Sequence, residues 1–186
     1  MSIFVHGDNI LQKENHNTKY RDAKSRQYLT EIRSKYEEWK QENLSLTGPL
    51  IEPSPDDKTI IERRVELFNQ YKDFIDQQKY AEQFDSRSNL HSSALEEFMY
   101  YLFKDMVSDY SDDALIGKSR AFKDLSFKSE NYQGMLALPG TLLEVKDYDF
   151  VIGATINATF HCKGKSSGDT ESFDMPAIAI ECKTYL

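Results

Sequence analysis

Cysteine is scarce in this sequence, and no long apolar run occurs in it. The two cysteines, Cys162 and Cys182, lack the CxxC or histidine-flanked spacing of metal sites, so we expect a reduced, cytoplasmic setting. There is no run of about 18 apolar residues and no charged-then-apolar leader. We therefore expect neither a membrane span nor a secretory signal.

Basic residues are outnumbered, with 23 Lys and Arg against 31 Asp and Glu and a formal net charge of −8. This balance argues against a protein that coats nucleic acid nonspecifically. It does not exclude a DNA enzyme, because local basic surfaces matter more than the sum of charges. Aromatic residues are plentiful, with 11 Tyr and 11 Phe, so we expect a packed globular chain of one domain, or one domain with an appendage.

Two helices are predicted in the first half of the chain. Apolar residues recur every three or four positions between about residues 20 and 43, which is the spacing of one helix face. The segment GPLIEPSPDD (48–57) holds three of the five prolines and ends that helix. Asp56 or Asp57 can cap a second helix with similar spacing, so we expect an antiparallel helical pair.

A third, strongly apolar helix is predicted in the segment SALEEFMYYLF (93–103). Ser93 and Glu96 have the spacing of a capping box, which places the start of this helix at Ser92 or Ser93. The segment that follows Asp113 mixes turn residues, basic residues and aromatics, and it favours a loop with short strands.

The last third of the chain predicts a β-hairpin. The runs LEVKDYDFVIGATINATFHC (143–162) and SFDMPAIAIECK (172–183) are rich in β-branched and aromatic residues, and the turn cluster KGKSSGD joins them. The fold class is therefore α+β, with N-terminal helices followed by a mixed sheet that contains a long antiparallel hairpin.

Three charged residues lie at the same end of this predicted hairpin. Residues that face each other across two strands share a face, and one register places Asp149 opposite Glu181, another opposite Lys183. Both registers put the turn at Lys165 or Ser166, inside the Gly/Ser cluster, and a bulge would shift them by one residue. We therefore expect Asp149, Glu181 and Lys183 to lie within about 5 Å of one another.

This grouping suits the hydrolysis of a phosphodiester. Two neighbouring carboxylates repel each other unless a cation lies between them, and Mg²⁺ accepts carboxylate oxygens together with water and substrate phosphate. Asp149 and Glu181 are the predicted metal ligands. An ammonium such as that of Lys183 can orient the attacking water and stabilise charge on the phosphate. Such triads are more often surface ion pairs, and the two apolar strands that lead to this one favour the functional interpretation.

An Asp on one strand followed by (D/E)-x-K on the next resembles the signature of the PD-(D/E)XK nucleases, here Asp149 and Glu181-Cys182-Lys183. Many members have Pro before the first Asp, whereas this sequence has Tyr148. The segments KDYDFVIG and IECKTYL also resemble type II restriction enzymes of the BbvCI kind, which cut asymmetric seven-base-pair sites with two different subunits or catalytic sites.

The resemblance implies a restriction-endonuclease-like αβββαβ core, of which αβββ is visible, and a Mg²⁺-dependent endonuclease that cuts double-stranded DNA. It divides the chain into a helical region, 1–88, and a partial nuclease core, 89–186, that lacks its last helix and strand. We therefore expect an N-terminal fragment that binds metal or DNA poorly when alone, or half of a site that a second subunit or a homodimer completes. A repair or structure-specific nuclease, or an idle DNA-binding or protein-interaction module, is the alternative.

The resemblance also implies an acid on the preceding helix, for which Glu97 is the choice and Glu96 the alternate, since Glu96 has the predicted capping role. Lys118, Arg120 and Lys123 lie among aromatics and predict a phosphate-contacting segment, although a solvated loop explains them equally well.

Overall fold

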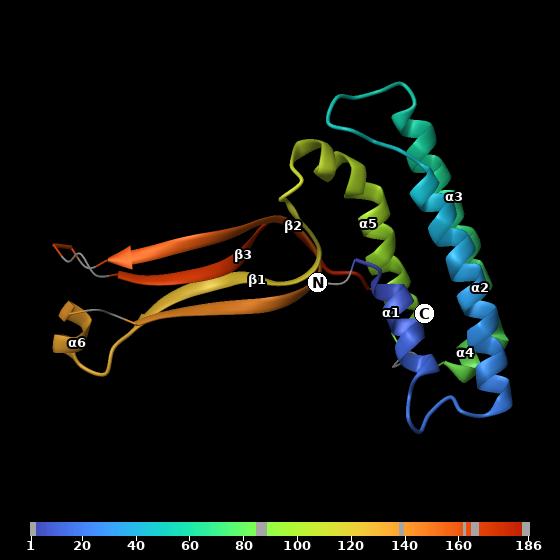
Figure 1. Ribbon diagram of the computed structural model, residues 1–186, viewed down its shortest axis with the longest axis horizontal. Coiled ribbons are helices and arrows are strands. Elements are labelled where there is room, and N and C mark those ends of the chain that lie inside the picture. Colours follow the sequence, from blue (N-terminus) through green and yellow to red (C-terminus); the bar gives the residue numbers. More distant parts are fainter. Residues whose placement is uncertain (1–2, 85–88, 138–139, 162, 165–167, 184–186) are drawn as a thin grey trace. The chain divides into compact units, whose positions relative to one another are not determined.

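The computed structural model describes residues 3–84, 89–137, 140–161, 163–164 and 168–183 (Figure 1). The chain forms two compact units. The helical unit comprises Met1–Asp112 with Cys182–Leu186, and the sheet unit comprises Asp113–Glu181. Each unit is described by itself below. The predicted domain boundary at residues 88 and 89 concerns the start of a nuclease core, and it stays a prediction.

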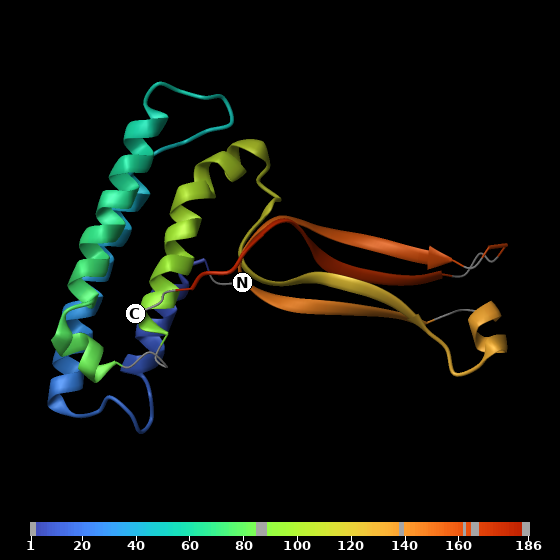
Figure 2. The same cartoon turned by 180° about the vertical axis from the view of Figure 1, so that it is seen from behind.

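Five helices make up the described part of the helical unit. The long helices α2 and α3 lie side by side and run in opposite directions in both views of the ribbon (Figures 1 and 2), which confirms the predicted antiparallel pair. The helices are α1 (Val5–Glu14), α2 (Ala23–Ser45), α3 (Asp57–Ile75), α4 (Gln78–Gln83) and α5 (Leu90–Tyr110). No helix in the described ranges is long and apolar enough to cross a membrane.

The helix starts follow local hydrogen bonding. The carboxylate of Asp22 caps α2 by accepting the backbone N–H of Ser25 at 2.8 Å. The start of α3 at Asp57 was predicted correctly, but the Asp56 side chain makes no capping hydrogen bond. The carboxylate of Asp57 instead accepts the N–H of Ser54 at 2.8 Å, so it orders the turn before the helix.

The predicted capping box at the start of α5 is wrong. This helix begins at Leu90, so Ser93 lies inside its first turn. The Ser93 hydroxyl donates backwards to the carbonyl of Asn89 at 2.6 Å, a bond that serine makes within a helix rather than at its cap. Glu96 therefore has no capping role at that position, and its side chain is buried.

Aromatic rings fill the core of the helical unit. Trp39 of α2 stacks on Tyr71 of α3 with 5.0 Å between ring centroids, and it meets the edge of Tyr101 of α5 at 5.2 Å. Such pairs add to the free energy gained by burying their area. The buried core consists of Ile10, Leu29, Ile32, Tyr36, Trp39, Leu67, Tyr71, Ile75, Tyr80, Phe84, Leu90, Ala94, Phe98 and Tyr101.

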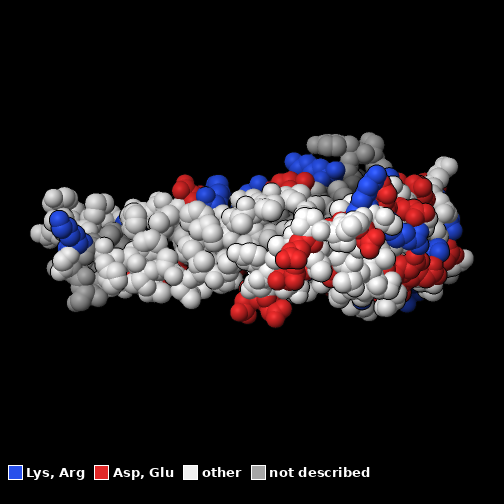
Figure 3. All heavy atoms as spheres, turned by 90° about the horizontal axis from the view of Figure 1, so that it is seen from above, with Lys and Arg blue, Asp and Glu red and all other residues white. Residues whose placement is uncertain are grey.

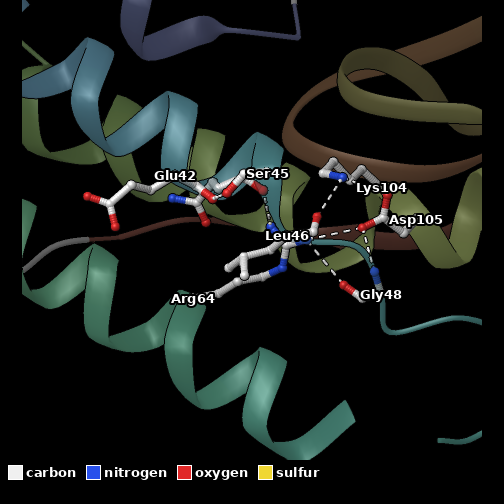
Figure 4. Close-up of polar contacts among 8 residues, drawn as sticks. Glu42, Ser45, Leu46, Gly48, Arg64, Lys104 and Asp105 are labelled. Carbon is white, nitrogen blue, oxygen red and sulfur yellow. Dashed lines mark hydrogen bonds and ion pairs between the residues drawn. The ribbon is translucent and has the colours of Figure 1, made fainter. Parts of the chain in front are cut away.

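A fully buried arginine joins the α2–α3 connection to α5 (Figure 4). The guanidinium of Arg64 donates to the carbonyls of Asn43, Leu46 and Gly48 at 2.9, 2.9 and 3.1 Å. It also pairs with the carboxylate of Asp105 at 3.1 Å. Burial lowers the pKa of Arg64, and the charge of Asp105 opposes that shift. The planar donor fork of arginine explains how one side chain satisfies several carbonyls at once.

The sheet unit holds three long strands and one short helix. Strands β1 (Leu115–Lys128) and β3 (Gly168–Ile180) each pair antiparallel with β2 (Gly140–His161), and α6 (Tyr132–Ala137) follows β1. A single parallel bridge, Ala121 to Asp174, joins β1 to β3 and makes the sheet mixed. The predicted α+β fold with a long antiparallel hairpin is confirmed; the predicted turn residues Lys165 and Ser166 lie outside the described residues.

The prediction of a loop with short strands after Asp113 is wrong, because β1 is a continuous strand of 14 residues. Its buried positions alternate regularly but carry the small residues Gly117, Ser119 and Ala121. Period-two burial is the signal of a strand, yet small side chains do not produce an apolar alternation in the sequence. The strand was therefore hidden by residue size rather than by an irregular backbone.

The hairpin of β2 and β3 contains a bulge in which Ala177 is the extra residue, because Ile152 pairs with Ile178 and Gly153 pairs with Pro176. A Cβ at Gly153 would lie 2.1 Å from the carbonyl oxygen of Met175, so only glycine allows the strands to approach this closely. The predicted one-residue shift by a bulge is thus present in the ladder.

Candidate active site

The strand register carries two of the predicted carboxylates to one end of the hairpin. Phe150 pairs with Ile180, and Val151 pairs with Ala179, at the end of the β2–β3 ladder. Asp149 and Glu181 occupy the next positions, so the ladder has the register that was predicted to place them opposite each other. Asp149 is half-buried, and Glu181 lies just beyond the last residue of β3.

A second bulge lies at the same point of β2. Asp149 and Phe150 together oppose the single residue Lys118 of β1. A bulge breaks the alternation of side chains and changes the direction in which one of them projects, and such bulges are frequent beside active sites. The three strands therefore bring Asp149, Glu181 and Lys118 to neighbouring backbone positions within the sheet unit.

The structure adds a lysine that the sequence pattern missed. The ammonium of Lys146 lies 2.6 Å from a carboxylate oxygen of Glu181 and 4.9 Å from the centroid of the Tyr148 ring. The hydrogen bond that the Lys146 ammonium donates to Glu181 raises the pKa of Lys146, and the charges of Glu181, Tyr148 and Asp149 act in the same direction. Strict alternation puts Lys146 and Asp149 on opposite faces of β2, so the sequence pattern gave no reason to group them.

The predicted catalytic lysine, Lys183, follows Glu181 by two residues and is exposed. It belongs by compactness to the helical unit, whereas Asp149 and Glu181 belong to the sheet unit. The approach of its ammonium to the two carboxylates therefore stays a prediction. Cys182, between the two charged residues, is buried.

Glu97, the predicted helix acid, is fully buried in the helical unit. One of its oxygens accepts the backbone N–H groups of His6 and Gly7 at 2.9 and 3.3 Å, and the other accepts the hydroxyl of Tyr101 at 2.7 Å. Burial raises the pKa of Glu97, and these hydrogen bonds oppose the shift. The carboxylate thus caps α1 from a neighbouring helix, and its predicted catalytic support stays a prediction.

The predicted DNA-contacting residues lie on strand β1 rather than in a loop. Arg120 pairs with Asp147 of β2 at 3.5 Å, and Lys123 pairs with Glu144 at 3.2 Å. All four side chains are at least half exposed, so Arg120 and Lys123 remain accessible to a phosphate. Asp147 of β2 therefore faces Arg120 rather than the predicted metal ligands. Contact of Lys118, Arg120 and Lys123 with DNA stays a prediction.

Charge is unevenly spread over the surface. In the space-filling view, acidic and basic side chains gather over the helical unit, while much of the sheet surface in that view carries neither (Figure 3). The described ion pairs of the sheet unit are Arg120–Asp147, Lys123–Glu144 and Lys146–Glu181, and the last of them lies at the end of the hairpin.

The donor set at the end of the hairpin fits a hard divalent cation. Within the described ranges, no group of three or more His, Cys, Asp or Glu residues could hold a metal. Magnesium does not need one, because it commonly takes one or two carboxylates and completes its shell with water and substrate phosphate. Asp149 and Glu181 supply such a pair, and the ammonium at Glu181 shows that the position attracts positive charge.

Comparison with known families supports a nuclease. A profile of the family described as Bpu10I restriction endonuclease matches residues 87–186, more than half of the chain. The match includes α5 with Glu97, the whole sheet unit, and Lys183. No curated protein matches the sequence.

Proposed function

Because this chain belongs to the Bpu10I restriction endonuclease family, we propose that it hydrolyses double-stranded DNA at a specific site, using Asp149, Glu181 and Lys183. Family membership implies a type II restriction endonuclease, which is a site-specific deoxyribonuclease with DNA as its substrate. The family typically needs a divalent metal. The observation that carries the proposal is the strand register that brings Asp149 and Glu181 to one end of the hairpin.

We assign the two carboxylates to Mg²⁺. Their oxygens are hard donors, and the paired strands β2 and β3 carry the two residues to neighbouring positions at the end of the ladder. Bound there, the cation would polarise the phosphoryl group of the scissile bond. Lys183 would orient the water that attacks phosphorus and stabilise the growing negative charge. Water then supplies the proton for the departing 3′ oxygen, and the cut leaves a 5′-phosphate.

The remaining predicted residues have supporting roles in this proposal. Glu97 would position α5 through its bonds to the start of α1, which makes it a positioning residue. Lys118, Arg120 and Lys123 would contact DNA phosphates from β1. We also propose a PD-(D/E)XK core over residues 89–186, a cleavage site of the asymmetric BbvCI kind, and a second subunit or homodimer that contributes to the active assembly.

Plasmid cleavage with Mg²⁺ by the full-length protein, with its partner where one is needed, tests the proposal. We expect Asp149→Ala and Lys183→Ala to reduce the rate by about 10²- to 10³-fold, the loss typical of removing one group that stabilises the transition state. Asp147→Ala is the matched control, because it removes a neighbouring acid of β2 that pairs with Arg120. Undiminished cutting by Asp149→Ala would overturn the assignment of the active site.

The pattern of products separates the alternatives. A restriction enzyme yields discrete fragments from a linear DNA, whereas a repair or structure-specific nuclease acts at nicks, flaps or mismatches. An idle binding module retards DNA on a gel and leaves it intact with every divalent metal tested.

A further inference from the structure

We infer that Lys146 is a positioning residue of this site: its ammonium holds Glu181 beside Asp149 before the metal binds, and then gives way to the metal. The inference rests on the proposed function, since it concerns the same two carboxylates. It concerns a residue outside the Asp and Glu-x-Lys pattern, three positions before Asp149 on the same strand.

The geometry places Lys146 where a cation would bind. Its ammonium lies 2.6 Å from Glu181, and Asp149 also acts on it electrostatically. The lysine, its ring contact Tyr148 and both carboxylates all belong to the sheet unit. The positive charge therefore neutralises part of the repulsion between Asp149 and Glu181 that the strand register imposes.

Another ion pair of the same sheet shows what is particular to Lys146. Lys123 and Glu144 also link two paired strands, with 3.2 Å between the charged atoms and side chains exposed by 55% and 50%. The contact of Lys146 with Glu181 is shorter, its side chains are exposed by 48% and 40%, and the face of Tyr148 lies under the ammonium. An aromatic ring attracts a cation and limits where the ammonium can move.

This arrangement has a consequence for metal binding. A divalent ion that binds the same oxygen of Glu181 competes with the ammonium of Lys146, so in our inference the metal displaces the ammonium from that oxygen. The displaced lysine stays tethered next to the site, within reach of the DNA phosphate that completes the metal shell. Removing its charge should therefore favour binding of the metal in the absence of DNA, the opposite of what a general loss of structure would do.

Calorimetric titration of the full chain with MgCl₂, without DNA, tests the inference. We expect Lys146→Gln to bind Mg²⁺ about five- to tenfold more tightly than the wild type, the effect of removing one charge about 4 Å away. Lys146→Arg keeps the charge and should bind like the wild type. Lys163→Gln is the matched control: it removes the same charge from an exposed residue beside the hairpin turn, and it should change affinity less than twofold.

The outcomes separate this inference from the proposed function. If the wild type binds Mg²⁺, Asp149→Ala abolishes binding, and Lys146→Gln leaves the affinity unchanged or lower, the inference about Lys146 falls and the active site stands. If the wild type does not bind Mg²⁺ and Asp149→Ala cuts DNA at the wild-type rate, both fall. Circular dichroism of Lys146→Gln confirms that it folds, and Lys146→Met, which removes the same charge with an apolar side chain and should also bind Mg²⁺ more tightly, replaces it if it does not.

Discussion

In the helical unit Glu97 and Arg64 are fully buried, whereas in the sheet unit Glu181 and Lys146 are about half exposed, with side-chain exposures of 40% and 48%. The buried carboxylate accepts hydrogen bonds from the backbone of α1 and from Tyr101 of its own helix, and the buried guanidinium donates to three carbonyls and a carboxylate. The exposed ion pair of Lys146 and Glu181 is a short contact, 2.6 Å, at the protein surface.

The difference indicates separate roles for the same kinds of residue. A buried charged group that has all its partners within the protein cannot exchange them without leaving those partners unpaired, which costs several kcal/mol. A half-exposed ion pair gains about 0–1 kcal/mol and can exchange its partner for a metal ion or a phosphate at little cost. Glu97 and Arg64 therefore stabilise the helical unit, whereas the ion pair of Lys146 and Glu181 can exchange its partners.

Replacing Arg64 is expected to have the largest effect on stability. Arg64→Met removes the guanidinium donor that three carbonyls and Asp105 share, so the free energy of unfolding should fall by about 4 kcal/mol. Trp39, the single tryptophan, is buried in the same unit, so its fluorescence during urea unfolding measures the change. Arg63→Met is the control: Arg63 is 42% exposed and pairs with surface glutamates, so its loss should cost at most about 1 kcal/mol.

Glu97 and Glu181 provide the direct test of the comparison between the units. Glu97→Ala removes the acceptor for two N–H groups at the start of α1, and it should lower the free energy of unfolding by about 3 kcal/mol. Glu181→Ala should change stability by less than about 0.5 kcal/mol while it abolishes cleavage. Urea unfolding and plasmid cleavage, measured on both variants, check that Glu97→Ala loses mainly stability and Glu181→Ala loses mainly cleavage.

The isosteric variant Glu97→Gln sharpens the same test. Its amide oxygen still accepts hydrogen bonds, so most of the stability should return. If folded Glu97→Gln cuts DNA normally, Glu97 acts only by holding α1. A folded but inactive Glu97→Gln would instead give its negative charge a part in the reaction.

His6 makes the helical unit sensitive to acid. Burial, followed by the charge of Lys13, lowers the pKa of His6 to about 3, and its ring nitrogens lie 2.9 Å from the Ser93 hydroxyl and 2.6 Å from the Tyr71 hydroxyl. Between that pKa and the ordinary value of about 6.5, the unfolded chain binds the proton and the folded chain does not. The free energy of unfolding should therefore decrease as the pH decreases, by about 2 kcal/mol from pH 6.5 to pH 5.

The control for this prediction is His6→Gln, which can hydrogen-bond but does not titrate in this range. Burial raises the pKa of Glu97, and this shift favours the folded state as pH falls, so the comparison between wild type and variant matters more than either slope. Unfolding of both proteins is monitored by Trp39 fluorescence at each pH. An equal loss of stability in wild type and variant would show that His6 is not the sensitive group.

Most of the fold could be predicted from sequence because large apolar side chains mark its long elements. The stripes of α2 and α3 and the apolar runs of β2 and β3 produce the periodicities of helix and strand. Strand β1 escaped because its buried face carries only small residues, and the start of α5 was misplaced because Ser93 bonds backwards within the helix. Both errors come from short polar or small side chains, for which pattern is a weak guide.

The site was predictable to the extent that two-residue alternation holds. It predicted that Asp149 and Glu181 take facing positions across the hairpin, and the ladder from Phe150 to Ile152 has that register. It missed Lys146, which strict alternation puts on the opposite face of β2 from Asp149. It also could not tell that Glu97 is enclosed by α1, since that contact joins residues 90 positions or more apart in the chain.

The ion pair of Arg120 and Asp147 should show the smallest effect on stability. Its charged atoms lie 3.5 Å apart, and the side chains are exposed by 72% and 78%. A double-mutant cycle with alanine at both positions should therefore give a coupling energy below about 0.5 kcal/mol.

DNA binding without metal is the informative measurement on the same variants. Arg120→Ala should weaken binding and reduce the slope of log affinity against log salt by about 1, as expected for one lost phosphate contact. An unchanged slope would remove Arg120 from the DNA interface. A coupling energy above about 2 kcal/mol would show that an exposed pair of the sheet stabilises the fold as the buried groups of the helices do.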